Sequence, residues 1–215
     1  MESIKPHDLL YVNYADLILE EKLPDWVNQN QLTDWAVVRR DQVVDDFIPV
    51  GLRGKNRNER LACWVKQADI IKVVSPYDLI TENYLQQVPE KRQREFEIFK
   101  TFKQLGNYLS NYKWGVGGSL GYELASQRSA VKQTSDIDVL IESDHPLTPS
   151  QKQELLSICN NMSSQMDIQI ITPFGGCSLL ELCQNNTHVL LKTLTGPMLV
   201  ENPWIEPKET IESIF

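Results

Sequence analysis

The chain has 215 residues, of which 41% are hydrophobic and 23% are charged, and its net charge at pH 7 is −8. This size and composition suit a globular protein of one large or two small domains, and neither half has the basic excess of a general nucleic-acid binder. Because no apolar run approaches the ~18 residues that a membrane helix needs and no signal-peptide-like stretch follows the N-terminus, we expect a cytoplasmic protein with neither membrane nor nucleic acid as a partner.

Residues 1–88 predict a small α+β domain. The apolar stretches 35–38 and 47–50 are typical of strands. Residues 57–68 carry apolar side chains at steps of three and four, which predicts a helix with Asn56 as its cap. Val88-Pro89 interrupts any helix, so we place the domain boundary there.

Residues 89–215 alternate helices with strands, which predicts an α/β architecture for the second domain. Thr148 is followed by proline and, three residues later, by glutamine, the pattern of a capping box at the start of a helix. The expected helices are 91–112, a short helix that follows Gly-Gly-Ser at 117–119 and runs to 124, and 148–162. The expected strands are 113–116, 137–141 and 166–171, and residues 189–193 and 198–200 are expected to form a hairpin.

Three aspartates form the most informative chemical pattern. Side chains alternate along a strand, so Asp136 and Asp138 in the Asp-Ile-Asp segment are expected on one face. Asp167 opens a second apolar strand, and if the two strands are neighbours the three carboxylates converge. Carboxylate oxygens are the ligands that Mg²⁺ prefers, and neighbouring carboxylates are tolerated where a cation separates them. We therefore expect Asp136, Asp138 and Asp167 to be both catalytic and metal-binding, with Mg²⁺ or Mn²⁺ as the cofactor.

Two other segments suit phosphate groups. Gly117, Gly118 and Ser119 precede a predicted helix, where backbone N–H groups bind anions and glycine allows close approach. Arginine suits bidentate phosphate contacts, and Arg53 and Arg57 lie in a segment with four basic residues among eight. That basic segment is either part of the phosphate site or a solvated surface turn.

The pattern of hydrophobic-Gly-Gly-Ser, Asp-x-Asp and a third aspartate in a strand resembles the nucleotidyltransferase superfamily typified by DNA polymerase β. The resemblance covers roughly residues 95–172 and implies a polymerase β-like catalytic domain preceded by the small α+β domain. Sixteen residues separate Ser119 from Asp136, somewhat more than is usual there, so we expect a longer helix or a loop near 126–134.

A narrower resemblance spans nearly the whole chain. It is to the phosphoribosyl-dephospho-CoA transferases of malonate decarboxylase, also called malonate decarboxylase holo-acyl-carrier-protein synthases. The segments that carry it are PVGLRG at 49–54, WGVGGSLGYEL at 114–124, TSDID at 134–138 and LLKT at 190–193. The family's acidic residues correspond to Asp136 and Asp138, whereas Asp167 is assigned from the superfamily pattern, and the likeness at 190–193 implies a phosphate contact for Lys192.

The resemblance implies a specific reaction. The donor would be 2′-(5″-triphosphoribosyl)-3′-dephospho-CoA, and the acceptor would be a serine of the acyl-carrier protein subunit of malonate decarboxylase. The serine oxygen would attack the α-phosphorus, and pyrophosphate would leave.

Two alternatives remain beside this hypothesis. One is another metal-dependent nucleotidyltransferase that acts on a different protein or a small molecule, and the other is a non-catalytic nucleotide-binding module. The presence of all three aspartates argues against the second. A carrier protein is usually acidic, so we also expect the basic residues Lys91, Arg92 and Arg94, which are unfavourable at a helix start, to serve as its docking site.

Overall fold

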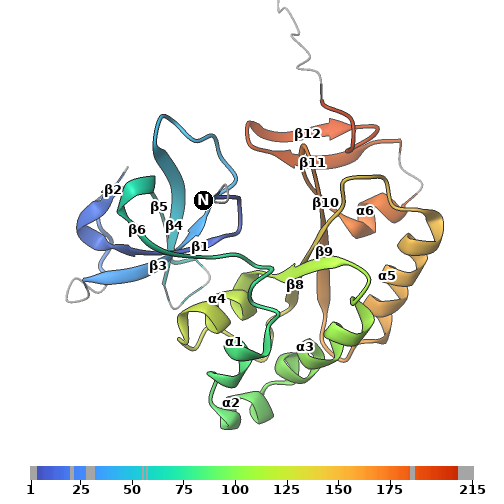
Figure 1. Cartoon of the computed structure of the whole chain (residues 1–215), viewed down its shortest axis with the longest axis horizontal. Coiled ribbons are helices and arrows are strands. Elements are labelled where there is room, and N and C mark those ends of the chain that lie inside the picture. Colours follow the sequence, from blue (N-terminus) through green and yellow to red (C-terminus); the bar gives the residue numbers. More distant parts are fainter. Residues whose placement is uncertain are drawn as a thin grey trace, which may run out of the picture.

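The computed structural model describes residues 4–19, 22–27, 32–54, 56, 58–184 and 187–207, and these form two lobes (Figure 1). Each lobe is built on a six-stranded sheet. The N-terminal sheet has the order β2-β5-β4-β3-β1-β6, and the C-terminal sheet has the order β12-β11-β10-β9-β8-β7. Two sheets with helices in the second lobe confirm the predicted mixed α and β class. Within the described ranges, no helix is long and apolar enough to cross a membrane.

The N-terminal lobe consists of antiparallel strands with a small core of its own, to which Leu10, Val50 and Val65 contribute. The predicted strands at 35–38 and 47–50 are confirmed within β3 and β4. The strands are β1 (Leu9–Asn13), β2 (Leu17–Leu19), β3 (Thr33–Val38), β4 (Phe47–Arg53), β5 (Arg60–Lys66) and β6 (Ile70–Val74), with the 3₁₀ turns η1 (Tyr14–Asp16) and η2 (Gln67–Asp69).

The predicted helix over 57–68 is wrong, because residues 60–66 form strand β5. Leu61, Cys63 and Val65 are buried in alternation, a period of two, and they continue the antiparallel pairing with β4. Asn56 caps no helix; its backbone N–H donates instead to Glu59 Oε2 at 2.8 Å. The apolar residues of this segment fit both periodicities over so short a stretch, and pairing with β4 decided between them.

The C-terminal lobe follows the predicted alternation of helices and strands. Its predicted strands at 113–116, 137–141 and 166–171 and its hairpin are confirmed. Its elements are α1 (Glu82–Gln86), α2 (Glu90–Glu95), α3 (Glu97–Tyr108), β7 (Lys113–Val116), α4 (Gly118–Ser126), β8 (Ile137–Glu142), α5 (Pro149–Asn161), β9 (Met166–Thr172), β10 (Gly175–Ser178), α6 (Leu179–Cys183), β11 (Val189–Thr193) and β12 (Gly196–Val200).

The sequence predicted the start of α5 correctly, but it predicted one continuous helix where the structure has two. The capping box is confirmed, since the Gln151 N–H donates to Thr148 Oγ1 at 3.2 Å and the Thr148 N–H donates to Gln151 Oε1 at 2.9 Å. The single helix predicted over 91–112 is wrong: α2 ends at Glu95, α3 begins at Glu97, and the last turn ends at Tyr108. Phe96 separates the two helices with extended backbone angles and a buried side chain.

The C-terminal sheet has one covered face and one face that belongs to the site. Ile137, Val139 and Ile170 point into the core under the helices, and Figure 1 shows α3 and α5 on the side away from the N-terminal lobe. The opposite face carries the alternate residues of β8 and β9 and looks toward the N-terminal lobe. Leu9 and Trp35 of the N-terminal sheet also pack on the larger core, so apolar contacts join the two lobes.

The chain crosses between the lobes after Val74, and α1 begins at Glu82. Pro76 lies on Gly115 of β7 so closely that a Cβ there would come within 2.6 Å of the Pro76 carbonyl oxygen. The crossing segment is therefore seated on the C-terminal sheet. The domain division proposed at 88/89 stays a prediction.

Candidate functional site

A cleft of about 590 Å³ lies between the two lobes. Its N-terminal wall comes from β3, β4 and β5, and its C-terminal wall comes from the start of α4 and from β8 and β9. The polar residues and glycines that line it are His7, Arg39, Arg40, Gly51, Arg53, Arg60, Gly117, Gly118, Asp138 and Gln169.

Asp138 and Asp167 are direct partners in the parallel pair of β8 and β9. Residues that face each other in neighbouring strands point to the same side of the sheet, so both carboxylates lie on the face toward the N-terminal lobe. Asp136 precedes β8 by one residue and is exposed. Two of the three predicted aspartates therefore lie side by side, and Asp136 lies just before the first residue of β8.

The Gly-Gly turn is built around Asp138. The Gly117 N–H donates to the backbone oxygen of Asp138 at 2.9 Å. Gly118 has a φ of +57°, and a Cβ placed there would lie 1.6 Å from Asp138 Oδ2. Position 118 therefore requires glycine for its left-handed backbone and for the space that the Asp138 carboxylate occupies.

The aspartates have the right chemistry to bind a magnesium ion, and two of the three have a suitable position. Their oxygens are hard ligands, and the in-register Asp138 and Asp167 place two carboxylates together. Among the described residues, however, no three His, Cys, Asp or Glu side chains gather closely enough to hold a metal ion. Joint ligation by Asp136, Asp138 and Asp167 thus stays a prediction that rests on strand register.

The predicted phosphate ligands are distributed unevenly. Gly117 and Gly118 line the cleft, whereas Ser119 is buried in the first turn of α4 and does not line it. Arg57 falls outside the described residues. Arg53 lines the cleft, and its guanidinium lies 5.6 Å from the centre of the Tyr122 ring of α4.

Three arginines place positive charge on the N-terminal wall, although Arg39 is paired with Asp41 at 3.1 Å. Arg53 and Arg60 are direct cross-strand partners in β4 and β5, and Arg39 lies alongside Gly51, which also lines the cleft. Like charges directly opposite each other in a sheet are destabilising. Their gathering beside Gly117, Gly118 and Asp138 indicates a site for a polyanion.

Lys192 lies at the other end of the site. The row Glu142–Ile171–Gly176–Lys192 runs across β8, β9, β10 and β11. At about 3.3 Å per residue along a strand and about 4.8 Å between strands, Lys192 is roughly 13 Å along and 14 Å across from Asp138. A contact between Lys192 and phosphates at the Gly-Gly turn therefore does not fit this geometry.

Lys192 instead lies near His7 and Arg40, two residues for which the sequence suggested no role. An Arg40 nitrogen contacts His7 Nε2 at 3.1 Å, and Arg40 rests on Gly176, where a Cβ would come within 2.8 Å of that guanidinium. The available sequence signal was the Arg39-Arg40 pair directly after a predicted strand. It could not indicate which lobe the two side chains would meet.

His7 is held as a neutral imidazole. Burial lowers its pKa to about 4, and the positive charges of Arg40 and Lys192 add to that effect. Its φ is +76°, and its N–H donates to the Val38 carbonyl at 3.0 Å. A neutral ring lets Nε2 accept the Arg40 hydrogen bond, so His7 orients a cation without adding a second one.

We expect His7 to make the protein less stable in acid. Its pKa is lower in the folded than in the unfolded chain, so the unfolded state binds more protons between pH 6.5 and 4. The free energy of unfolding should fall as the pH drops through this range and lose no more from this group below pH 4. His7→Asn, which tolerates positive φ, should reduce this part of the slope in urea unfolding measured from pH 7 to 4, whereas His188→Asn, at an exposed position, should not.

Glu123 of α4 organises the segment that leads to the aspartates. Its side chain is only 2% exposed. It accepts hydrogen bonds from Arg92 Nε at 2.5 Å and Nη2 at 2.8 Å, and from the backbone N–H groups of Ala130 at 2.7 Å and Val131 at 2.8 Å. The predicted loop near 126–134 is therefore present, and a buried carboxylate fastens it.

This arrangement corrects the docking prediction for Arg92. Its guanidinium binds Glu123, donates to the Val131 carbonyl at 3.1 Å and lies 4.5 Å from the centre of the Phe96 ring. Arg92 thus ties α2 to α4 and is not available to a carrier protein. A docking role stays a prediction only for Lys91 and Arg94.

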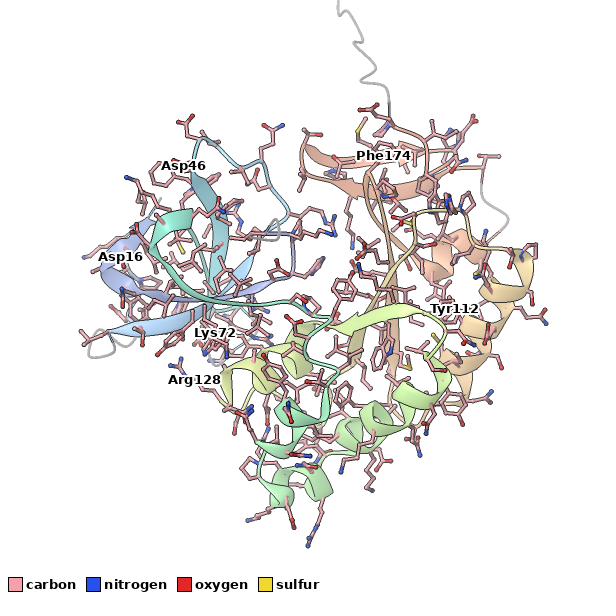
Figure 2. All side chains as sticks on the ribbon, viewed as in Figure 1. Asp16, Asp46, Lys72, Tyr112, Arg128 and Phe174 are labelled. Carbon is pink, nitrogen blue, oxygen red and sulfur yellow. The ribbon has the colours of Figure 1, made fainter. Side chains whose placement is uncertain are left out.

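A second connection between the lobes lies at the far side of the cleft. Arg128, which follows α4, forms an ion pair with the buried Asp34 of β3, and Tyr14 donates a hydrogen bond to the same carboxylate. Figure 2 labels Arg128 where the two lobes meet. The ion pair gives Arg128 a partner in the N-terminal lobe, so it holds the two lobes together.

Two neighbouring strands carry paired carboxylates, and these lie with a glycine turn opposite several arginines. Such an arrangement defines the class of the protein as an enzyme that acts on phosphate-bearing substrates. Comparison with known proteins specifies the family. The model of the phosphoribosyl-dephospho-CoA transferase MdcG N-terminal domain matches residues 5–76, and that of its C-terminal domain matches residues 85–203. The chain belongs to this family of transferases and is an enzyme.

Curated relatives agree over nearly the full length. A phosphoribosyl-dephospho-CoA transferase of Klebsiella pneumoniae (strain 342) is 34% identical over 201 residues, which cover 93% of this chain and 96% of the relative. Transferases of the same name from Pseudomonas fluorescens (strain Pf0-1) and Pseudomonas aeruginosa are 32% and 31% identical, covering 94% and 93% of this chain and 95% and 93% of those relatives. No solved structure gives a significant match.

Proposed function

We propose that the protein transfers phosphoribosyl-dephospho-CoA from 2′-(5″-triphosphoribosyl)-3′-dephospho-CoA to a serine of the acyl-carrier subunit of malonate decarboxylase and releases pyrophosphate. The relatives' shared name supports the transferred group. The observation that carries the proposal is the position of Arg53 and Arg60, which line the same cleft as Gly117, Gly118 and Asp138.

Charge supports a triphosphate at this place. The chain carries a net charge of −8, so a polyanionic substrate is attracted only where cations gather locally. Arg53 and Arg60 supply such a gathering, with Arg39, which pairs with Asp41, beside them, and arginine forms bidentate hydrogen bonds with phosphate oxygens. The first turn of α4 adds backbone N–H groups and the positive end of a helix dipole.

In the proposed reaction, the serine oxygen forms a bond to the α-phosphorus, and the bond from that phosphorus to the oxygen bridging it to the β-phosphorus breaks. Asp167 accepts the hydroxyl proton, because a serine hydroxyl is a weak nucleophile unless a base is adjacent. Arg53 and Arg60 bind the β- and γ-phosphates that leave as pyrophosphate. Asp136, Asp138 and Asp167 would hold Mg²⁺ or Mn²⁺, whose chemistry when bound is to polarise the phosphate oxygens.

Intact-mass spectrometry of the carrier subunit tests the proposal. Incubation of the apo carrier with the enzyme, the triphosphoribosyl donor and Mg²⁺ should add one phosphoribosyl-dephospho-CoA group and release one pyrophosphate per carrier. A carrier whose acceptor serine is replaced by alanine is the matched control and should stay unmodified. The proposal is wrong if the wild-type carrier keeps its apo mass or if the alanine carrier gains the same mass.

A further inference from the structure

A second chamber of about 340 Å³ continues the inter-lobe cleft. It shares His7, Arg40 and Leu140 with the first cleft, so these three residues form the passage between the two. Figure 2 labels Phe174, which also lines this chamber, in the upper part of the C-terminal lobe.

Arg40 gives the passage positive charge, and Lys192 lies close enough to act electrostatically on His7, although Lys192 itself lines neither the cleft nor the chamber. Neither Arg40 nor Lys192 forms an ion pair with a carboxylate in the described part of the chain. Burial lowers the pKa of Arg40, so the surroundings disfavour its charge. Lys192 stands opposite Gly176, on which Arg40 rests, so both side chains share one face of the sheet.

The acidic residues of the chamber are engaged elsewhere or open to solvent. Glu142 pairs with Lys113 at 2.9 Å, and Asp8 accepts the backbone N–H of Lys5 at 2.8 Å. Asp144 is exposed. Among the described residues, none of these three carboxylates forms an ion pair with Arg40 or Lys192, so both cations can bind an anion.

Beyond the passage, part of the chamber wall is apolar, beside the charged residues Lys5, Asp8, Glu142 and Asp144. Tyr77 and Phe174 face it together with aliphatic and proline side chains, namely Pro6, Ile171, Pro173 and Leu194. A cationic entrance beside a partly apolar chamber matches a ligand in which a diphosphate carries a long, mostly uncharged arm with polar amide and hydroxyl groups.

We propose that Arg40 and Lys192 bind the diphosphate that joins adenosine to pantetheine in the donor, and that the chamber lined by Tyr77 and Phe174 accepts the pantetheine arm. This inference rests on the proposed function. The donor carries phosphate groups on both sides of its two ribose units, and the cleft carries separate cationic groups near Asp138 and near Lys192. His7 acts here as a positioning residue, since its Nε2 holds the Arg40 guanidinium toward the passage.

Calorimetric titration with dephospho-CoA tests this site without the transfer reaction, because dephospho-CoA has the diphosphate and the arm but no triphosphate. Arg40→Gln and Lys192→Gln should each weaken its binding on the order of 10- to 100-fold, as expected for the loss of a hydrogen bond to a charged group. Lys100→Gln, which removes an exposed lysine of α3, is the matched control and should bind like the wild type.

ADP separates the arm from the diphosphate. Phe174→Ala should weaken dephospho-CoA about tenfold through lost apolar contact and leave ADP binding unchanged, whereas Arg40→Gln should weaken both ligands. Undetectable binding of dephospho-CoA to the wild type, or equal affinities for the wild type and the Arg40 and Lys192 variants, would overturn the diphosphate assignment. Unchanged dephospho-CoA binding in Phe174→Ala would overturn the arm assignment.

The binding titrations and the carrier-modification assay together distinguish this inference from the proposed function. If wild-type enzyme modifies the carrier but the Arg40 and Lys192 variants bind dephospho-CoA normally, the second site is wrong and the reaction stands. If dephospho-CoA binds as expected but the carrier is never modified, the binding site stands and the proposed acceptor is wrong.

Discussion

Asp138→Asn is expected to lower kcat for carrier modification on the order of 10³-fold or more, with little change in stability. Asparagine has the same shape as aspartate but no negative charge. The variant therefore loses the charge that would bind the metal ion and, through it, stabilise the reacting phosphate. The Asp138 backbone hydrogen bond to Gly117 does not involve the side chain and is kept. Single-turnover transfer at saturating Mg²⁺, followed by intact mass, measures the change in the chemical step.

A matched variant separates a local effect from a general change in charge. Asp46→Asn removes the same charge from an exposed position in the N-terminal lobe, labelled in Figure 2, and should leave the rate unchanged. Asp138→Asn should also keep its affinity for dephospho-CoA, because the proposed diphosphate site lies at the other end of the cleft. A near-normal transfer rate for Asp138→Asn would remove Asp138 from the catalytic set.

Arg92→Met should lower the free energy of unfolding by about 3–5 kcal/mol, the usual effect of leaving one partner of a buried ion pair uncompensated. Glu123 is 2% exposed and would keep only its two backbone donors. Methionine retains apolar contact with Phe96, so the change reports mainly on the charge. Urea unfolding at pH 7, followed by circular dichroism, measures the loss.

Arg94→Met is the control, because Arg94 lies in the same helix and also pairs with a glutamate. That pair is on the surface, with both side chains 80% exposed, and should contribute less than about 1 kcal/mol. Similar losses for the two variants would contradict the role given to Glu123. A destabilised Arg92→Met enzyme with normal transfer per folded molecule would show that Glu123 fastens the fold without tuning the active site.

Short-range signals in the sequence determined much of the C-terminal lobe. Short apolar segments predicted the strands that hold Asp138 and Asp167, and the residues at 148–151 predicted a capping box whose hydrogen bonds are present. Two glycines before a helix predicted a turn, and Gly118 indeed has a positive φ. Each of these features depends on residues within a few positions of each other, so the local pattern contains the necessary information.

Only the tertiary structure decided which distant residues meet. Parallel pairing put Asp138 beside Asp167, antiparallel pairing put Arg53 opposite Arg60, and packing of the lobes brought Arg40 onto Gly176. The same dependence explains the two wrong helices. The segment 57–68 had a pattern that fitted helix and strand until β4 paired with it, and the helix over 91–112 broke where Phe96 turned into the core. Strand register and core packing are set by contacts between residues far apart in the chain, and periodicity within a single segment carries no information about them.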